Sequence, residues 1–253
     1  MAESDIKTVN RADAECGGPP ADREIDGTVN VYPLGPPIRW TRWSDEGVGT
    51  VDVANQPMSL TERRAEELRL QIAIAARDIF LADGSTSATV ERICEAVGIA
   101  QRTFHRHFPV KEDVILPLFR QFGMLSAQVL ADAGPGDDAV GVLVEAFSTE
   151  VPKRGRIEID RTFMSLVIDN PQYRLRWLDW GQDLVGPVTE FLGERFDLGA
   201  DPYTRELPAQ FVLQTCRHAY VHWVEHGDFA ILRSALRVGM RMVVVSLIPA
   251  SPT

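Results

Sequence analysis

Residues 89–113 read TVERICEAVGIAQRTFHRHFPVKED, and this stretch predicts two short helices joined by a tight turn. Ile93 and Val97 fall on one face of the first helix, and Thr89 precedes it as an N-cap. Gly98 is suited to end that helix because glycine adopts a positive φ without strain. The pattern is that of a helix-turn-helix, a module that places its second helix in the major groove of DNA.

The second helix, residues 101–108, is expected to have an apolar and a polar face. Phe104 and Phe108 are four positions apart, so both lie on the inner side of the helix. The outer side carries side chains that can hydrogen bond to DNA, namely Gln101, Arg102, Thr103, His105 and Arg106. Pro109 stops the helix. The alternative interpretation is a helical hairpin whose polar face meets only solvent.

The composition allows a sizeable core but gives an unusual charge for a DNA-binding protein. The chain has 253 residues, of which 45% are hydrophobic, and a net charge of −10. Residues 59–120 are balanced, with nine basic and nine acidic side chains, so the excess acid lies elsewhere. Phosphate binding requires only a local cationic surface, not a basic protein.

The sequence gives no sign of export or membrane insertion. The three cysteines are far apart and predict neither disulfides nor a zinc site, which fits a cytoplasmic protein. The N-terminus lacks the apolar core of a signal peptide. Arginines interrupt the apolar stretch 229–248 at every fourth position from Arg233, which predicts an amphipathic helix and no membrane partner.

Helical patterns follow one another through the rest of the chain, and no strand is predicted. Residues 1–58 are rich in Gly, Pro and acid and predict a disordered extension. Order begins at a capping box formed by Ser59 and Glu62. Further helices are expected at 60–83, 111–133 with a break near Pro117, 137–151 capped by Asp137, 156–169, 170–196, 203–226 and 229–247. The fold class is therefore all-α with about nine helices.

Residues 62–113 resemble the N-terminal domain of TetR-family transcriptional regulators. The motifs that carry this are AARDIFLADG at 75–84, then TVERICEAVGIAQRTFHRHFPVKEDV. The chain departs from the family pattern at Ala100 and Val110, where the family usually has Ser, and at His105, where it has Tyr. The resemblance implies a three-helix DNA-binding domain at 59–110 and a helical effector-binding and dimerisation domain at 111–253.

The resemblance also implies which residues contact DNA. Gln101, Arg102 and Thr103 would face base edges or the phosphates beside them. His105, His107 and Lys111 would hold backbone phosphates, which fixes position but carries no sequence information. Arg63 and Arg64 would reach the neighbouring backbone or the minor groove. For each residue the alternative is an ordinary solvated side chain.

The second region is rich in aromatic residues that could surround a ligand or simply fill the core. The candidates for a pocket are Phe122, Phe147, Phe163, Trp177, Trp180, Tyr220 and Trp223. In the resembling family this region binds a small molecule and forms a homodimer, which would read a palindromic operator in double-stranded DNA. The last two helices are the expected interface, and the alternative is that their apolar face is buried within the monomer. That face carries Phe229, Leu232, Leu236, Val243 and Leu247.

His218, His222 and His226 repeat every four residues on one predicted helix. Adjacent pairs could share a metal ion, but the outer two are roughly 12 Å apart along the axis, so one ion cannot take all three. The alternative is a structural role, since His226 near a helix C-terminus is explained by the helix dipole. We predict no metal ion and no cofactor.

The sequence thus predicts a sequence-specific DNA-binding transcriptional regulator, a repressor, that a small-molecule ligand releases or modulates. One alternative is a TetR-like scaffold that uses its acidic N-terminal arm for protein contacts and binds DNA weakly or not at all. An enzyme is not expected, because the chain has no phosphate loop, nucleophile elbow or paired-carboxylate pattern.

Overall fold

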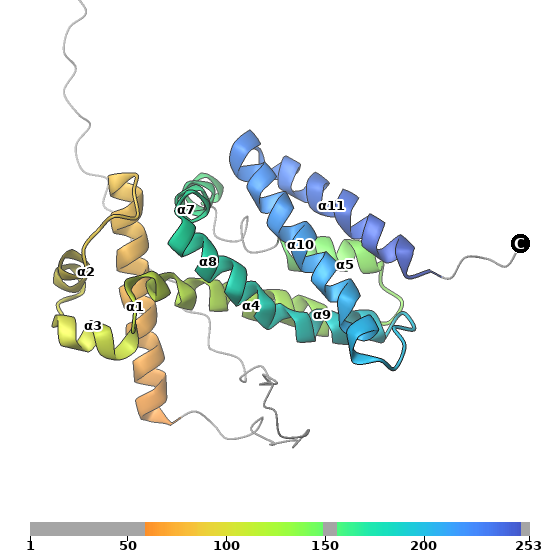
Figure 1. The fold of residues 1–253 in the computed structure, drawn as a ribbon, viewed down its shortest axis with the longest axis horizontal. Coiled ribbons are helices and arrows are strands. Elements are labelled where there is room, and N and C mark those ends of the chain that lie inside the picture. Colours follow the sequence, from red (N-terminus) through yellow and green to blue (C-terminus); the bar gives the residue numbers. More distant parts are fainter. Residues whose placement is uncertain (1–58, 149–155, 249–253) are drawn as a thin grey trace, which may run out of the picture. The chain divides into compact units, whose positions relative to one another are not determined.

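The computed structural model describes residues 59–148 and 156–248, and every regular element in these ranges is a helix (Figure 1). The elements are α1 (Leu60–Asp83), α2 (Val90–Val97), α3 (Gln101–His107), η1 (Lys111–Ile115), α4 (Leu116–Ala131), α5 (Ala139–Ala146), α7 (Ile157–Asp169), α8 (Pro171–Trp180), η2 (Gly181–Leu184), α9 (Val185–Gly193), α10 (Pro202–His226) and α11 (Phe229–Ser246). The all-α prediction is confirmed. The extension predicted at 1–58 lies outside the described residues.

The ends of the first two helices follow the sequence signals. The Glu62 amide donates to Ser59 Oγ at 3.2 Å, and the Ser59 amide donates to Glu62 Oε2 at 2.8 Å, which completes the predicted capping box. Hydrogen bonds from the Ser59 backbone amide and then from the Ser59 side chain lower the pKa of the Glu62 carboxyl. Thr89 Oγ1 accepts from the Arg92 amide at 3.3 Å and caps α2. Gly98, with φ 74°, ends α2 as predicted.

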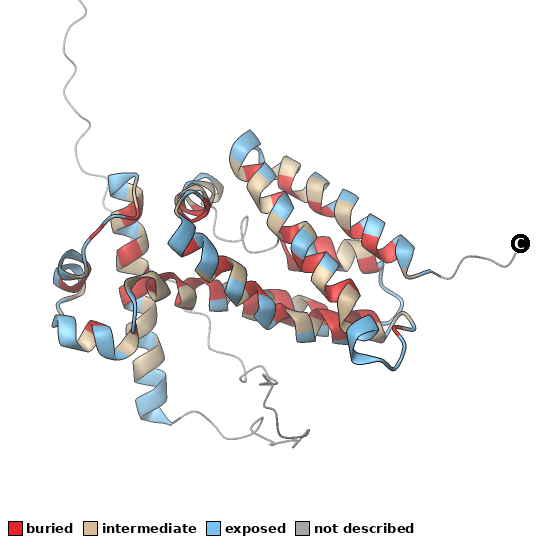
Figure 2. Cartoon of the chain, in the orientation of Figure 1, coloured by how far each residue is buried: buried red, intermediate tan, exposed pale blue. Residues whose placement is uncertain are grey.

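One apolar core joins the first three helices to the rest of the chain (Figure 2). Phe80, Ile93 and Phe104 are fully buried within the first region. Tyr173 of α8 packs edge-on against Phe80, with ring centroids 5.5 Å apart. The side-chain amide of Asn170, Nδ2, also donates to Thr86 Oγ1 at 2.9 Å. The helix-turn-helix therefore rests directly on the second helical region.

Two predicted helices are wrong in their detail. Asp138, not Asp137, caps α5, since its carboxylate accepts from the Val140 and Gly141 amides. The Asp137 carboxylate instead accepts from the Gly134 amide at 2.8 Å, within the preceding turn. The predicted end of that helix at residue 151 lies outside the described residues.

The helix predicted at 170–196 is three elements, α8, η2 and α9. Pro187 lies in the first turn of α9 and has no amide hydrogen, so an uninterrupted α-helix would lose a backbone hydrogen bond there. The break predicted near Pro117 is confirmed, because η1 precedes α4 and Pro117 falls in the first turn of α4. Helix α3 ends at His107, one residue earlier than predicted.

The last two helices lie side by side (Figure 1) and pack closely. A Cβ atom on Gly239 would come within 2.2 Å of Thr215 Cγ2, so the glycine permits this approach. Leu232, Leu236 and Val243 are buried within the chain, so the prediction that they face a partner is wrong. The exposed large apolar residues of the pair are Tyr203, Phe211, Val238, Met242 and Val245.

Among the described residues, one stretch passes a length-and-composition test for a membrane span. It is Lys111–Ala131, with a mean hydropathy of 1.4, and 44% of its most apolar window is buried inside the structure. Leu118, Phe119 and Leu130 of this stretch belong to the core. Its apolar character is thus explained by packing between helices.

Candidate DNA-binding surface and ligand pocket

Helix α3 presents a polar outer face because two aromatic side chains anchor its inner face. Phe104 and Phe108 are buried, and their ring centroids are 5.2 Å apart. Arg102 and Arg106 are exposed on the opposite side, as are Gln101 and His105, whereas Thr103 is half-buried. A seven-residue helix with an apolar anchor and an exposed polar face is the geometry that groove reading requires.

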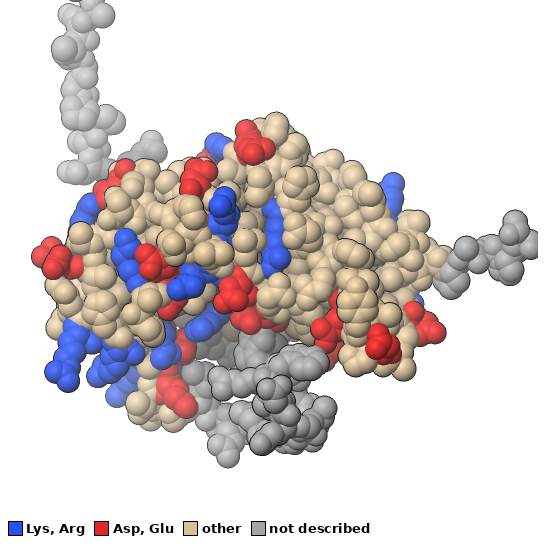
Figure 3. All heavy atoms as spheres, in the orientation of Figure 1, with Lys and Arg blue, Asp and Glu red and all other residues tan. Residues whose placement is uncertain are grey.

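A basic surface runs from α3 to the N-terminal half of α1, where Figure 3 shows blue side chains gathered at the lower left. The exposed arginines on these elements are Arg63, Arg64, Arg102 and Arg106. None of the four pairs with a carboxylate among the described residues. Other arginines of this region do pair, such as Arg77 with Asp78 at 2.8 Å. In the described part of the chain, no carboxylate therefore competes with phosphates for these four guanidinium groups.

Two residues predicted to contact DNA, Gln101 and Lys111, form hydrogen bonds inside the protein. Gln101 Nε2 donates to Glu91 Oε1 of α2 at 3.0 Å. Lys111 Nζ donates to the backbone oxygens of Thr86 and Ala88, each at 3.3 Å, and so ties η1 to the loop before α2. One of the three ammonium hydrogens of Lys111 remains for a phosphate.

His107 lies on the inner side of α3. Its Nε2 is buried and has no hydrogen-bond partner in the described part of the chain. Burial lowers the pKa of the His107 imidazole, and the nearby positive charges of Arg69 and Arg106 lower it further. A neutral, inward-facing ring does not favour the phosphate contact predicted for this residue, which stays a prediction.

A pocket lies among α4, α5, α7, α8, η2 and α10, with a volume of about 660 Å³ including its open mouth. Five of the predicted residues line it, namely Phe122, Phe147, Trp177, Trp180 and Tyr220. Phe163 and Trp223 do not line it. The Trp223 ring is fully buried behind Tyr220, with centroids 5.8 Å apart, and Phe163 packs against Phe119 at 6.4 Å. Both fill the core, which was the alternative for each aromatic residue.

Among the polar groups of the pocket, Tyr220 was predicted, whereas Arg217 and Cys216 were not. Arg217 Nη2 donates to the Leu178 carbonyl at the end of α8 at 2.6 Å, and Tyr220 OH donates to the Phe147 carbonyl at 3.0 Å. Burial raises the pKa of the Cys216 thiol well above its ordinary value, so the thiol stays protonated. The α10 lining residues Leu213, Cys216, Arg217 and Tyr220 are spaced i, i+3, i+4 and i+7. That spacing was the signal in the sequence that they share a face.

The helix-turn-helix has an exposed basic helix, and it shares its core with a helical bundle that contains an aromatic pocket. These features define the class of helix-turn-helix proteins with an appended helical domain. Residues 72–118 match the family model for bacterial regulatory proteins of the tetR family. Over this region the chain is similar to transcriptional regulators of the TetR family.

Two curated relatives are similar to more than half of the chain. The transcriptional regulator TcmR of Streptomyces glaucescens is 28% identical over 161 residues, which cover 60% of this chain and 71% of that protein. The transcriptional repressor AcnR of Corynebacterium diphtheriae is 30% identical over 138 residues, covering 52% of this chain and 66% of the relative.

The crystal structure of a transcriptional regulator from Rhodococcus sp. Rha1 has a similar fold, with a TM-score of 0.50 and 16% identity. The match covers 72% of this chain and 99% of the Rhodococcus chain. At this identity the likeness concerns the all-α fold alone.

Proposed function

We propose that the chain is a sequence-specific DNA-binding repressor in which α3 reads the major groove. The observation that carries this proposal is the outer face of α3, where Arg102 and Arg106 are exposed and have no carboxylate partner within the described ranges. A guanidinium group can donate two hydrogen bonds to guanine O6 and N7, which gives base discrimination. Arg63 and Arg64 would add phosphate contacts beside it. Such a regulator acts in the cytoplasm, where its operator DNA is found.

A homodimer fits this function because two α3 helices would read a palindromic operator. The exposed apolar residues on α10 and α11 are the surface proposed for this two-fold contact. Native mass spectrometry of the full chain should give a two-chain mass.

The pocket is proposed to bind a small-molecule effector that changes DNA affinity. Trp177 of α8 lines the pocket, while the residue before it, Arg176, pairs with Asp113 of η1 at 2.7 Å. Tyr173, one turn earlier, packs against Phe80 of α1. A ligand that moves α8 therefore also moves the side chains of α8 that pack against the helix-turn-helix region. It shifts DNA binding only if it prefers one of the two positions of α8.

The lining indicates the chemistry of that effector. Phe119 stacks on Trp180, with ring centroids 5.3 Å apart and planes 26° from parallel, which offers a flat apolar wall. Arg217 is the charged residue of the lining, and it pairs with no carboxylate of the described chain. We propose a ligand with an aromatic body and an acidic or hydrogen-bond-accepting group that meets Arg217.

The DNA-binding proposal is tested with Arg102→Ala and with the matched control Arg205→Ala, an exposed arginine at the start of α10. Gel retardation compares operator DNA, selected from fragments of the chain's own promoter, with a scrambled sequence. Loss of Arg102 should reduce the preference for operator DNA by about 1–3 kcal/mol, while Arg205→Ala retains it.

If the wild-type chain retards operator and scrambled DNA equally weakly or not at all, and Arg102→Ala changes nothing, the scaffold alternative is correct. The net charge of −10 favours that alternative, because a scaffold needs no cationic surface.

A further inference from the structure

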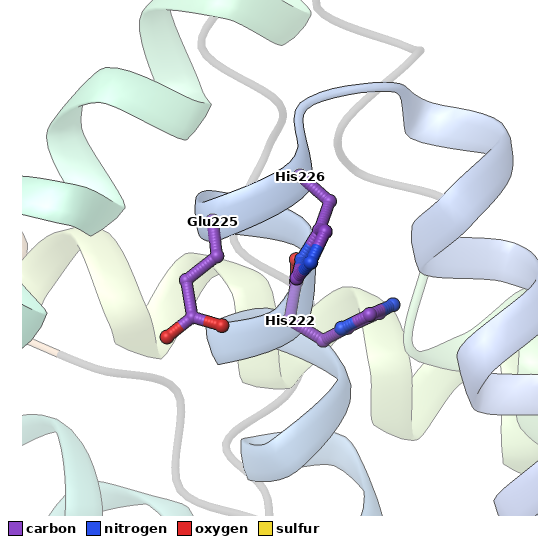
Figure 4. A group of neighbouring side chains, drawn as sticks. All are labelled: His222, Glu225 and His226. Atoms are coloured by element: carbon purple, nitrogen blue, oxygen red, sulfur yellow. The ribbon is translucent and has the colours of Figure 1, made fainter.

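Three metal-ligating side chains converge at the C-terminal end of α10. The ligand atoms of His222, Glu225 and His226 all lie within 4.8 Å of one another. In Figure 4 the three side chains project from neighbouring turns of the helix, with the His226 ring between the other two. The two imidazole rings have centroids 4.2 Å apart. His218 is not part of this group.

The hydrogen bond of His226 already prepares its ring as a ligand. His226 Nδ1 lies 2.9 Å from the backbone oxygen of His222. A carbonyl oxygen can only accept, so Nδ1 carries the hydrogen of the neutral ring and Nε2 keeps a free lone pair. Histidines that bind metals commonly donate their second ring nitrogen to a carbonyl, because this fixes the ring and its tautomer.

The charges around the group favour a cation. The backbone carbonyls at the end of α10 carry a partial negative charge, and Glu225 adds a full one. Glu225 has no hydrogen bond or ion pair with any described residue. The cation beside it is Arg161 of α7, whose Nη1 donates to the Val224 carbonyl at 3.2 Å. The charge of Arg161 is offset by Glu158, 3.0 Å away.

We propose that His222, Glu225 and His226 bind one divalent transition-metal ion of the zinc, nickel or copper type. Two imidazole nitrogens and one carboxylate suit these ions, whereas magnesium and calcium prefer all-oxygen ligands. Ligand atoms around tetrahedral zinc are about 3.3 Å apart, for bonds of about 2.0–2.1 Å. Exposed side chains reach that spacing by small rotations about their χ angles. The remaining coordination position is open to water.

Binding at this place has a structural consequence that does not depend on the proposed function. The three residues lie in the last turns of α10, directly before the chain turns at Gly227 into α11. An ion bound by both His222 and His226 stabilises the last turn of α10. Because the ion binds only the folded chain, it raises the stability in proportion to the logarithm of its concentration above Kd.

The test is calorimetric titration of zinc chloride into the tag-free full chain, with Cys16→Ser in every variant to remove a competing thiol. One ion per chain should bind with a Kd on the order of micromolar. His222→Ala and His226→Ala should each weaken binding about tenfold or more, and Glu225→Gln by a smaller factor. His218→Ala, on the same helix but outside the group, is the matched control and should bind within about twofold of the parent.

Magnesium chloride at millimolar concentration should produce no saturable heat. Circular dichroism without metal should be the same for all variants, which separates loss of a ligand from loss of fold. Absence of saturable zinc binding, or equal affinities for His226→Ala and His218→Ala, would overturn the proposal.

Discussion

The helix-turn-helix and the pocket are both built from helices, but they use their polar groups in opposite ways. In α3 the arginines proposed to contact DNA point outward from a single seven-residue helix, and two phenylalanines hold that helix in place. In the pocket the functional side chains point inward and come from six elements spread over about a hundred residues. The residues of an exposed binding surface can lie in one short stretch of sequence, whereas the residues that line a cavity come from many parts of the chain.

The difference also decides which residues serve stability. Arg102 and Arg106 are exposed and pair with no described carboxylate, so their removal should leave the fold unchanged. Trp180 lines the pocket and at the same time stacks on Phe119 of α4. In the pocket, function and packing therefore use the same side chains.

The largest expected effect is from Phe104→Ala, which removes the inner anchor of α3 and leaves its outer face intact. Phe104 is fully buried, and truncation of a buried phenylalanine costs about 3–5 kcal/mol. Urea denaturation should show this loss, and DNA retardation should fall with it although no DNA-facing group has changed. Arg106→Ala is the control on the same helix and should keep its unfolding free energy within about 0.5 kcal/mol. Equal stability of the two variants would contradict the division between an inner and an outer face.

Gly123→Ala is the corresponding change in the pocket region. A Cβ atom at Gly123 would lie 2.9 Å from Trp180 Cζ2, so the indole ring must move within the pocket wall. We expect a loss of about 1–3 kcal/mol from overpacking. Gly186→Ala is the control, because a Cβ atom there meets no atom within 4 Å and both changes remove a helical glycine.

The readout for Gly123→Ala is binding of 8-anilinonaphthalene-1-sulfonate, an aromatic anion that suits the lining and Arg217. Its affinity should fall severalfold in Gly123→Ala and remain unchanged in Gly186→Ala, while operator retardation without ligand is preserved in both. Unchanged dye binding in Gly123→Ala would show that the dye does not occupy this pocket.

The same contrast explains how much the sequence could predict. The fold class, the capping box at Ser59, the turn at Gly98 and the inner position of Phe104 were all predicted, because each depends on residues a few positions apart. The break of the helix predicted at 170–196 was missed, although Pro187 was visible in the sequence. A proline in a first helical turn is compatible with a new helix start, because an amide hydrogen at that position has no partner within the helix.

The pocket could be predicted only in part, since aromatic composition does not say which rings face a cavity. Phe163 and Trp223 were predicted to line the pocket but fill the core, whereas Arg217 lines the pocket and was not predicted to do so. Arg217 is held by the Leu178 carbonyl, 39 positions earlier in the chain. No local pattern encodes a contact of that sequence separation. Glu91 likewise meets Gln101 only because α2 and α3 pack together.

Arg64→Ala should have a smaller effect that concerns affinity and not fold. Arg64 is exposed in the first turns of α1 and pairs with no described carboxylate. If it contacts one phosphate, its removal should lower the slope of log affinity against log salt by about 0.9. Binding to operator and scrambled DNA should weaken about equally, because phosphate contacts carry no sequence information. Arg205→Ala should leave the slope unchanged, and the same slope for both variants would remove Arg64 from the DNA-binding surface.

The smallest effect concerns His107, which has the inward environment of a pocket residue although it belongs to α3. Burial, followed by the charges of Arg69 and Arg106, lowers the pKa of this imidazole below its ordinary value of 6.5. On acidification through 6.5 the unfolded chain therefore takes up a proton that the folded chain does not. Stability from the neutral ring is present above that pH and is lost as the pH falls through the folded-state pKa.

The midpoint of thermal unfolding should consequently fall between pH 7.5 and 5.5 by a larger amount in the wild-type chain than in His107→Gln. His105→Gln, on the exposed face of the same helix, controls for the loss of an imidazole as such. An identical pH dependence in wild type and His107→Gln would place the His107 ring in solvent. It would then belong with the outward-facing groups of α3, and a phosphate contact would again be open to it.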